Sequence, residues 1–269
     1  MTSMPYTLPR DWPLGRMIGA GVLALVAAFA VFGPMLVPGD PFAQSLMQSL
    51  SGPEAGAPFG YDHLGRSLYH RLAHALRLSP FIALAAVATA GAAGLVLGTL
   101  AAARGGWVER MLVILADALM ALPGLLLVLI VLAIMPGTAT GFWAGLSLVL
   151  WVEFFRLTRA ATRATLASPA VEASRLLGFG WPYILHRHLW PEIAPLMLTA
   201  AALGTATAIM GIAALGFVSV GMRAPTPELG LMMVELLPYW REAPMALLTP
   251  VIATFTLLFG LTLLAGGQK

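Results

Sequence analysis

Residues 80–103 read PFIALAAVATAGAAGLVLGTLAAA, a run without a single charged side chain. A helix needs about 20 mostly apolar residues to cross the hydrocarbon core of a bilayer, so this stretch predicts a transmembrane helix. Within it, Gly94 and Gly98 have the small-residue spacing that lets two membrane helices approach closely. The stretch therefore predicts a span that packs tightly against a neighbouring helix.

The whole chain shares this apolar character. Of its 269 residues, 59% are hydrophobic and 10% are charged, and the mean hydropathy is +0.86. Soluble domains have roughly 45–50% apolar and about 25% charged residues, so these values indicate an integral membrane protein. The isoelectric point is near 9.7. Because arginines flanking spans set topology, we expect them to serve orientation and expect no nucleic-acid partner.

Apolar segments along the chain predict an all-α polytopic membrane protein with six transmembrane helices. The expected spans are residues 17–37, 80–103, 111–135, 142–157, 193–220 and 244–265. The first is longer than the apolar core of a signal peptide, about 7–15 residues, so we interpret it as a retained anchor. Residues 1–16 then form a cytoplasmic N-terminal segment, and residues 17–269 form one transmembrane domain.

The distribution of basic residues predicts the orientation of these spans. With the N-terminus inside, ten basic residues are cytoplasmic and five are external, which agrees with the positive-inside rule. The cytoplasmic set is Arg10, Arg16, Arg104, Arg110, Arg156, Arg159, Arg163, Arg175, Arg187 and Lys269. This orientation places residues 158–192 inside and residues 38–79 and 221–243 outside.

A compact polar segment, VEASRLLGFGWPYILHRHLWPE at residues 171–192, interrupts the apolar chain. Ahead of it, Ser168 and Pro169 are typical of a helix start. Gly178 is typical of a helix stop, which predicts a short helix over Pro169–Leu177. A helix of this length is not stable alone in water. It must lie either on the lipid headgroups or in a groove of a protein partner that receives Val171, Leu176 and Leu177.

The residues of this segment resemble a known motif. Glu172-Ala173-Ser174, followed by Gly178 and by His188-Leu189-Trp190-Pro191, is similar to the E-A-A-x-x-x-G…L-P cytoplasmic loop of ABC importer permeases. Ser174 stands where the family has its second alanine. In that family the short helix docks in a cleft of the ATPase subunit and passes its motion to the membrane helices.

Three further segments resemble the dipeptide, oligopeptide and nickel group of these permeases. Phe59 through Arg66 is similar to the group's F-G-T-D-x-L-G-R segment, and Asp117 through Gly124 to its D-x-x-x-x-x-P-G stretch. Gly216 through Gly221, followed by Ala224 through Gly230, is similar to its S-F-L-G-L-G…P-P-x-P-x-W-G run. The four segments occur in the family's order, and the resemblance extends over most of the chain.

The resemblance implies a type I ABC importer permease in a bacterial inner membrane. It implies a second related permease, two ATP-binding subunits and an extracytoplasmic substrate-binding protein as partners. The ATPase-coupling residues would be Val171, Glu172, Ala173, Ser174, Arg175, Leu176, Leu177 and Gly178. The only lysine is Lys269, so the chain lacks the G-K-[ST] of a phosphate-binding loop. ATP and Mg would therefore be bound by the partner ATPases, and no cofactor or catalysis is expected here.

Several other residues are weaker candidates. Asp117 lies a few residues into the third expected span, where a charge is costly and suggests function. A structural ion pair, for which Arg104 or Arg110 could be the partner, or a packing role is the favoured interpretation, and a pathway role is the alternative. Met210 and Met222 are further pathway candidates, although methionine within helices usually serves packing.

Three histidines are candidate metal ligands. His70 and His74 would share one face of an outer-surface helix over Tyr69–Leu78, with His63 upstream. The favoured interpretation is a polar amphipathic helix, because no acidic third ligand is evident.

Two rival functions remain open at this point. A self-sufficient secondary transporter or channel would need ionisable groups near the membrane midplane. A structural subunit of a membrane enzyme would be indicated by paired histidines within spans, and none is seen. For an importer, the cargo could be small peptides, nickel or a metal chelate.

Overall fold

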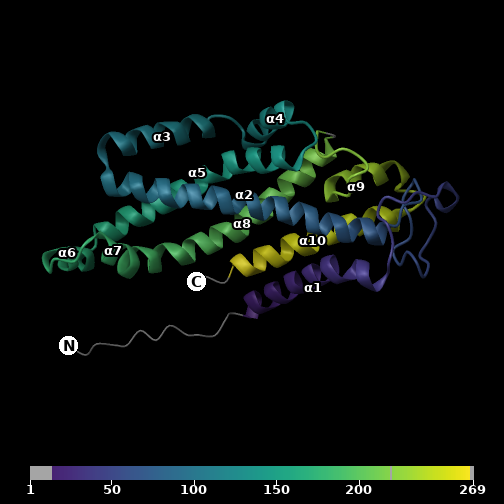
Figure 1. Ribbon diagram of the computed structural model, residues 1–269, viewed down its shortest axis with the longest axis horizontal. Helices are drawn as coiled ribbons and strands as arrows, with labels where there is room; N and C mark the ends of the chain where they lie inside the picture. Colours follow the sequence, from purple (N-terminus) through teal and green to yellow (C-terminus); the bar gives the residue numbers. More distant parts are fainter. Residues whose placement is uncertain (1–13, 219, 267–269) are drawn as a thin grey trace.

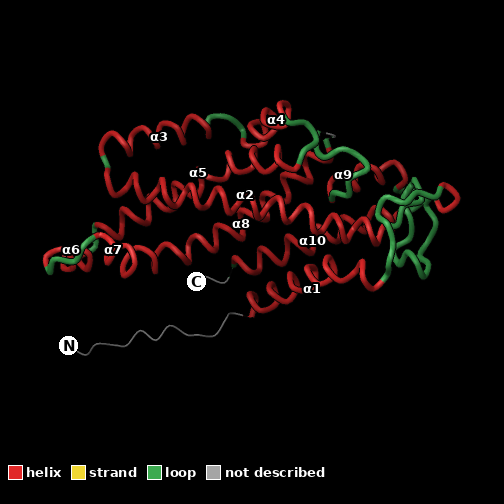
Figure 2. The backbone as a smooth tube through the Cα atoms, viewed as in Figure 1, coloured by secondary structure: helices red, strands yellow, loops and turns green. Residues whose placement is uncertain are grey.

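The computed structural model describes residues 14–218 and 220–266, and these form a bundle of long helices (Figures 1 and 2). The long helices are α1 (Leu14–Leu36), α2 (Leu68–Arg104), α5 (Ala139–Leu166), α8 (Trp190–Phe217) and α10 (Pro244–Ala265). The shorter ones are α3 (Gly106–Met120), α4 (Gly124–Ile134), α6 (Pro169–Leu176), α7 (Trp181–Ile184) and α9 (Leu229–Leu236). Three single turns complete the order: η1 (Leu46–Gln48), the π-helix η2 (Leu185–Leu189) and η3 (Leu237–Tyr239).

Among the described residues, five continuous helices are long and apolar enough to cross a membrane. The third expected span, residues 111–135, is not one helix as predicted. It is divided into α3 and α4, which meet at 85°. Pro123 lies at the break, where its ring disfavours helical geometry in the preceding residue and it has no amide hydrogen to donate. The number of spans is six if this bent pair is counted as one.

The bounds of the other spans differ from the prediction mainly by extension. The last one, Pro244–Ala265, has the predicted bounds. Helix α2 begins at Leu68, so the separate surface helix expected over Tyr69–Leu78 is instead its first turns, with Pro80 inside the helix. Helix α5 continues past residue 157 to Leu166. Residues 1–13 and 267–269, which belong to the expected N-terminal and transmembrane regions, and residue 219 lie outside the described residues.

Helix α2 makes its most extensive contact with α5, and the two lie side by side along the bundle (Figure 1). A Cβ added at Gly94 would lie 2.7 Å from the backbone nitrogen of Phe155, and one at Gly98 would lie 2.7 Å from the carbonyl oxygen of Phe155. The predicted close neighbour of the Gly94–Gly98 pair is therefore α5. Phe154 and Phe155, both 1% exposed, fill the space beside the glycines.

The remaining long helices, α8, α10 and α1, pack beside this pair and against one another. Helix α8 packs against α2, α5 and α10, and α1 packs against α10. The last contact is also close, since a Cβ at Gly19 would lie 2.8 Å from the Gly260 carbonyl oxygen. Figure 1 shows α6 and α7 at one end of the bundle and residues 37–67 at the other. We call these the α6 end and the loop end.

The glycines of α2 allow a direct test of this packing. We expect Gly94→Ala to destabilise the protein by about 1–3 kcal/mol, because the added methyl group overlaps the α5 backbone. Gly91→Ala is the matched control, since its nearest neighbour, the Met197 Cε, would be 3.6 Å away in ordinary contact. Thermal unfolding of the purified protein measures both changes, and equal midpoints for the two variants would contradict the close α2–α5 contact.

Candidate functional site

The start of helix α6 is fixed by the residues that the sequence indicates. The Ser168 side chain accepts a hydrogen bond from the Val171 amide at 3.4 Å, and Pro169 occupies the first turn. Glu172 also lies in this first turn, where a negative charge suits the positive end of the helix dipole. The predicted helix is confirmed.

The end of α6 is a glycine stop. Gly178 has a φ of +84°, its amide donates to the Arg175 carbonyl at 3.0 Å, and the Phe179 amide donates to the Ser174 carbonyl at 3.0 Å. This pair of bonds is the Schellman arrangement, in which glycine tolerates the left-handed conformation. The helix ends at Leu176, with Leu177 as its C-cap, one residue before the predicted end.

One face of α6 packs on the membrane bundle. Val171 is fully buried and forms a cluster with Ile184 of α7, Leu189 of η2 and Ile193 of α8. The expectation that Val171 enters the groove of a partner is therefore wrong. Its side chain is already covered within the chain, so it anchors α6 rather than contacting another protein.

A hydrogen bond makes the second attachment of α6. His188 Nε2 lies 2.9 Å from the Ser174 hydroxyl oxygen, and that hydroxyl donates to the Ala170 carbonyl at 2.9 Å. Because a hydroxyl carries one proton, His188 is the donor to Ser174. The sequence did not reveal this contact, although Ser174 departs from the family's alanine at this position. Together with the Val171 cluster, it ties α6 to the start of α8.

The other face of α6 is exposed and partly apolar. Leu176 and Leu177 are 84% and 76% exposed, and Glu172, Ala173 and Arg175 are exposed beside them. Isolated exposed leucines are normal on soluble surfaces, but two adjacent ones at the tip of a short helix, flanked by charges, are typical of a protein contact. The helix therefore has an anchored face and a free face.

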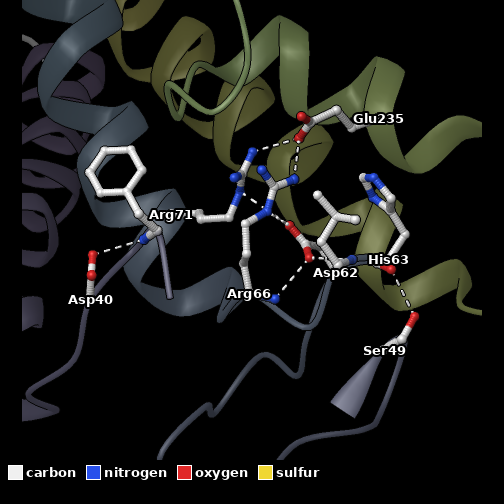
Figure 3. A network of polar contacts seen from close by, with 9 residues as sticks. Asp40, Ser49, Asp62, His63, Arg66, Arg71 and Glu235 are labelled. Carbon is white, nitrogen blue, oxygen red and sulfur yellow. Dashed lines mark hydrogen bonds and ion pairs between the residues drawn. The ribbon is translucent and has the colours of Figure 1, made fainter. Parts of the chain in front are cut away.

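A second polar site lies at the loop end, and Figure 3 shows it closely. Arg66 Nε lies 2.6 Å from the Asp62 carboxylate. The Glu235 carboxylate of α9 accepts from Arg66 Nη2 at 2.9 Å and from Arg71 Nη2 at 2.6 Å. Asp62, Arg66 and Arg71 are each 1% exposed. Burying these charges is costly without partners, so their mutual pairing holds the loop, α2 and α9 in one arrangement.

A buried carboxylate begins helix α9. Glu228 lies in the connection after α8, outside the candidate spans, and accepts from the Gly230 and Leu231 amides at 2.9 and 2.8 Å. It also accepts from the Ser79 hydroxyl of α2, at 3.3 Å. Burial raises the pKa of the Glu228 carboxyl above its ordinary value, and these hydrogen bonds oppose that rise. Glu228 thus caps α9 and holds it against α2.

The three candidate histidines lie in separate environments. The ring nitrogens of His70 lie 2.9 Å from the Ser67 hydroxyl and 2.6 Å from the Val37 carbonyl. The ring of His63 stacks on Tyr239 with 5.3 Å between centroids. His74 lines a pocket of about 420 Å³ beside Arg77. Within the described residues, no three histidine, aspartate or glutamate side chains are grouped as a metal site.

The pathway candidates occupy different environments. Asp117 is 59% exposed and pairs with Arg156 of α5 at 2.7 Å, rather than with Arg104 or Arg110 as expected. Arg104 at the end of α2 and Arg110 near the start of α3 are not its partners, because α3 runs back along α5 and carries Asp117 away from that end of the bundle (Figure 1). Met210 is 64% exposed on α8, whereas Met222 is 6% exposed and belongs to the core.

The described residues thus form a multi-pass helical membrane domain with a short capped helix anchored between two spans. Residues 94–266 match the family model described as the binding-protein-dependent transport system inner membrane component. Residues 15–53 match the N-terminal transmembrane domain of oligopeptide transport permease C. The chain belongs to this family of inner-membrane permease components.

Several characterised relatives cover nearly the whole chain. The dipeptide transport system permease protein DppC of Haemophilus influenzae is 28% identical over 100% of this chain and 97% of its own length. The di/tripeptide transport system permease protein DppC of Pseudomonas aeruginosa is 31% identical over 95% of the chain and 86% of its own length. The nickel transport system permease protein NikC of Escherichia coli is 30% identical over 87% of this chain and 84% of its own length.

The network at the loop end generates a prediction. We expect Glu235→Gln to lower the free energy of unfolding by about 3 kcal/mol, because an amide removes the charge that neutralises two buried arginines. Thermal unfolding and limited proteolysis of the purified protein measure the loss. Glu242→Gln, at an exposed glutamate of the same segment, is the control and should change neither value. A Glu235→Gln variant as stable as Glu242→Gln would show that the pairing is not structurally important.

Proposed function

We propose that this chain is one membrane-spanning half of an ATP-driven importer and that α6 is its coupling helix. The observation that carries the proposal is the division of α6 into two faces. One is joined to α7, η2 and α8 through Val171 and Ser174. The other face is exposed at the surface of the chain and carries Glu172, Ala173, Arg175, Leu176 and Leu177. A helix of this kind can receive a force on one side and pass it to a membrane span on the other.

The coupling would work through differential contact. When partner ATPases bind ATP and close, their clefts move the exposed face of α6. Because Val171 is buried against Ile184, Leu189 and Ile193, α8 must follow this displacement. A partner can bias two conformations only by contacting them differently, and α6 is the surface that meets this requirement. ATP and Mg would be bound in those partners, since this chain has no phosphate-binding loop.

The proposed orientation places the α6 end in the cytoplasm, as the positive-inside rule favours. The loop end, with its buried ion network, then faces an extracytoplasmic substrate-binding protein. A second related permease would complete the translocation pathway between the two chains. The pair Asp117–Arg156 and the exposed Met210 are proposed to face that shared pathway.

The cargo is proposed from the relatives. Two are named as dipeptide or di/tripeptide permeases and one as a nickel permease. The class is therefore a small peptide, nickel or a metal chelate. A self-sufficient secondary transporter is not favoured, because the relatives are components of multi-subunit transport systems and the exposed face of α6 suits a protein partner.

The glycine stop of α6 provides a test of coupling. We expect Gly178→Ala to impose about 1–2 kcal/mol of backbone strain at a φ of +84°. The end of α6 should therefore distort, and transport should fall relative to ATP hydrolysis. Gly180→Ala is the control, because Gly180 has a φ of −80° and a Cβ there would meet nothing closer than 3.7 Å. Both rates are measured in proteoliposomes of the complete importer. Unchanged coupling in Gly178→Ala would contradict the role of this helix end.

The exposed leucines provide a test of docking. We expect Leu176→Asp to release the ATPase subunits, because a charge replaces an apolar contact, while the permease still inserts. The control is Leu46→Asp at the loop end, where the leucine side chain is likewise exposed, at 73%. Affinity purification of the complex from membranes measures the ATPase retained. Retention of the ATPases by Leu176→Asp at the control's level would place their docking site elsewhere.

A further inference from the structure

A large groove lies on the bundle near the α6 end, between α2 and the segment from α7 to the start of α8. Its volume is about 850 Å³, within the range of small-molecule sites. Leu95 and Thr99 of α2 line it together with Leu185 of η2 and Ile193 of α8. Most of the lining side chains are apolar.

One rim of the groove carries a positive charge and a second polar donor. Arg104, the last residue of α2, and His186 of η2 both line it, and none of the described residues that line it is acidic. Within the part of the chain that the structure describes, neither Arg104 nor His186 has a side-chain partner. The nearby arginines of α5 differ, since Arg156 pairs with Asp117 and Arg159 with Glu109. No carboxylate of the described residues therefore neutralises the charge of Arg104 at the groove.

Two tryptophans mark the level of this rim. Trp181 and Trp190 line the groove, and their side chains are 41% and 51% exposed. Tryptophan is enriched where a membrane meets water, because its ring is apolar and its N–H group is polar. The cationic rim consequently lies at the depth of lipid headgroups, with the aliphatic wall extending from it toward the hydrocarbon.

We propose that this groove binds an anionic phospholipid of the inner leaflet. The headgroup phosphate meets Arg104 and His186, and the acyl chains lie along Leu95, Thr99 and Ile193. Basic pockets between transmembrane helices on the cytoplasmic side are suited to anionic headgroups. The charge of the rim selects the occupant, because an apolar helix of a second subunit would leave the Arg104 guanidinium unpaired. The proposal rests on the proposed function in one respect, the cytoplasmic placement of the α6 end. It does not depend on contact between α6 and an ATPase.

The site adjoins the coupling segment. His186 faces the groove, and His188, in the same π-helical turn, bonds to Ser174 of α6. A lipid held by His186 would therefore brace the turn through which α6 is attached to α8. The lipid requirement and the coupling function can nevertheless be measured separately.

The test uses the complete importer in nanodiscs that contain phosphatidylglycerol or only phosphatidylcholine. A photoreactive benzoylphenylalanine replaces Thr99 in the groove, and mass spectrometry identifies what it labels. We expect a phosphatidylglycerol adduct that exceeds the phosphatidylcholine adduct. In the Thr99-labelled protein, Arg104→Gln should lower the phosphatidylglycerol adduct about fivefold, the effect of removing one charge at the membrane surface.

Arg110→Gln is the matched control, because Arg110 is exposed near the start of α3 and does not line the groove. Equal labelling of the two lipids, or equal effects of Arg104→Gln and Arg110→Gln, would overturn the proposal. An adduct to the partner permease would also overturn it and would identify the groove as a subunit interface. ATPase retention is measured on the same preparations, so that loss of assembly is distinguished from loss of lipid.

Discussion

The close approach of α2 to α5 is the contact on which the rest of the structure depends. Gly94 and Gly98 bring the two backbones so near that no side chain fits between them. Helix α5 ends at Leu166, directly ahead of α6, and α2 begins at Leu68 within the ion network of the loop end. This helix pair therefore connects the two polar ends of the bundle, and the part of the bundle between them is mostly apolar.

The segments at the two ends of the bundle are held in place by different interactions. At the loop end, Asp62, Arg66, Arg71 and Glu235 are removed from water and neutralise one another, which gives a fixed geometry. At the other end, α6 has only 8 residues, too few to be stable alone. It is held by one buried valine and one histidine–serine bond. The first arrangement favours rigidity, whereas the second leaves a surface free for a partner.

Much of this could be predicted from local sequence. The lengths of the apolar segments predicted the spans. Ser168, Pro169 and Gly178 predicted α6, because capping interactions act within a few residues of a helix end. The break at Pro123 was missed because hydropathy continues through it. The start of α2 was missed because Pro80 is tolerated inside the helix. The pairing of Arg66 with Glu235 could not be predicted, since the two residues lie 169 positions apart. The Phe59–Arg66 resemblance was nevertheless a signal that Asp62 and Arg66 matter.

The central claim is that α6 and the start of α8 move as one unit. The chain has no cysteine, so spin labels can be attached uniquely at Ala170 of α6 and Glu192 of α8, both exposed. A second pair joins Ala170 to the exposed Phe81 of α2. Pulsed electron paramagnetic resonance would measure both distances in the complete importer, with and without trapped ATP. The account predicts an unchanged Ala170–Glu192 distance and a shifted Ala170–Phe81 distance. A shift between Ala170 and Glu192 on ATP trapping would contradict it.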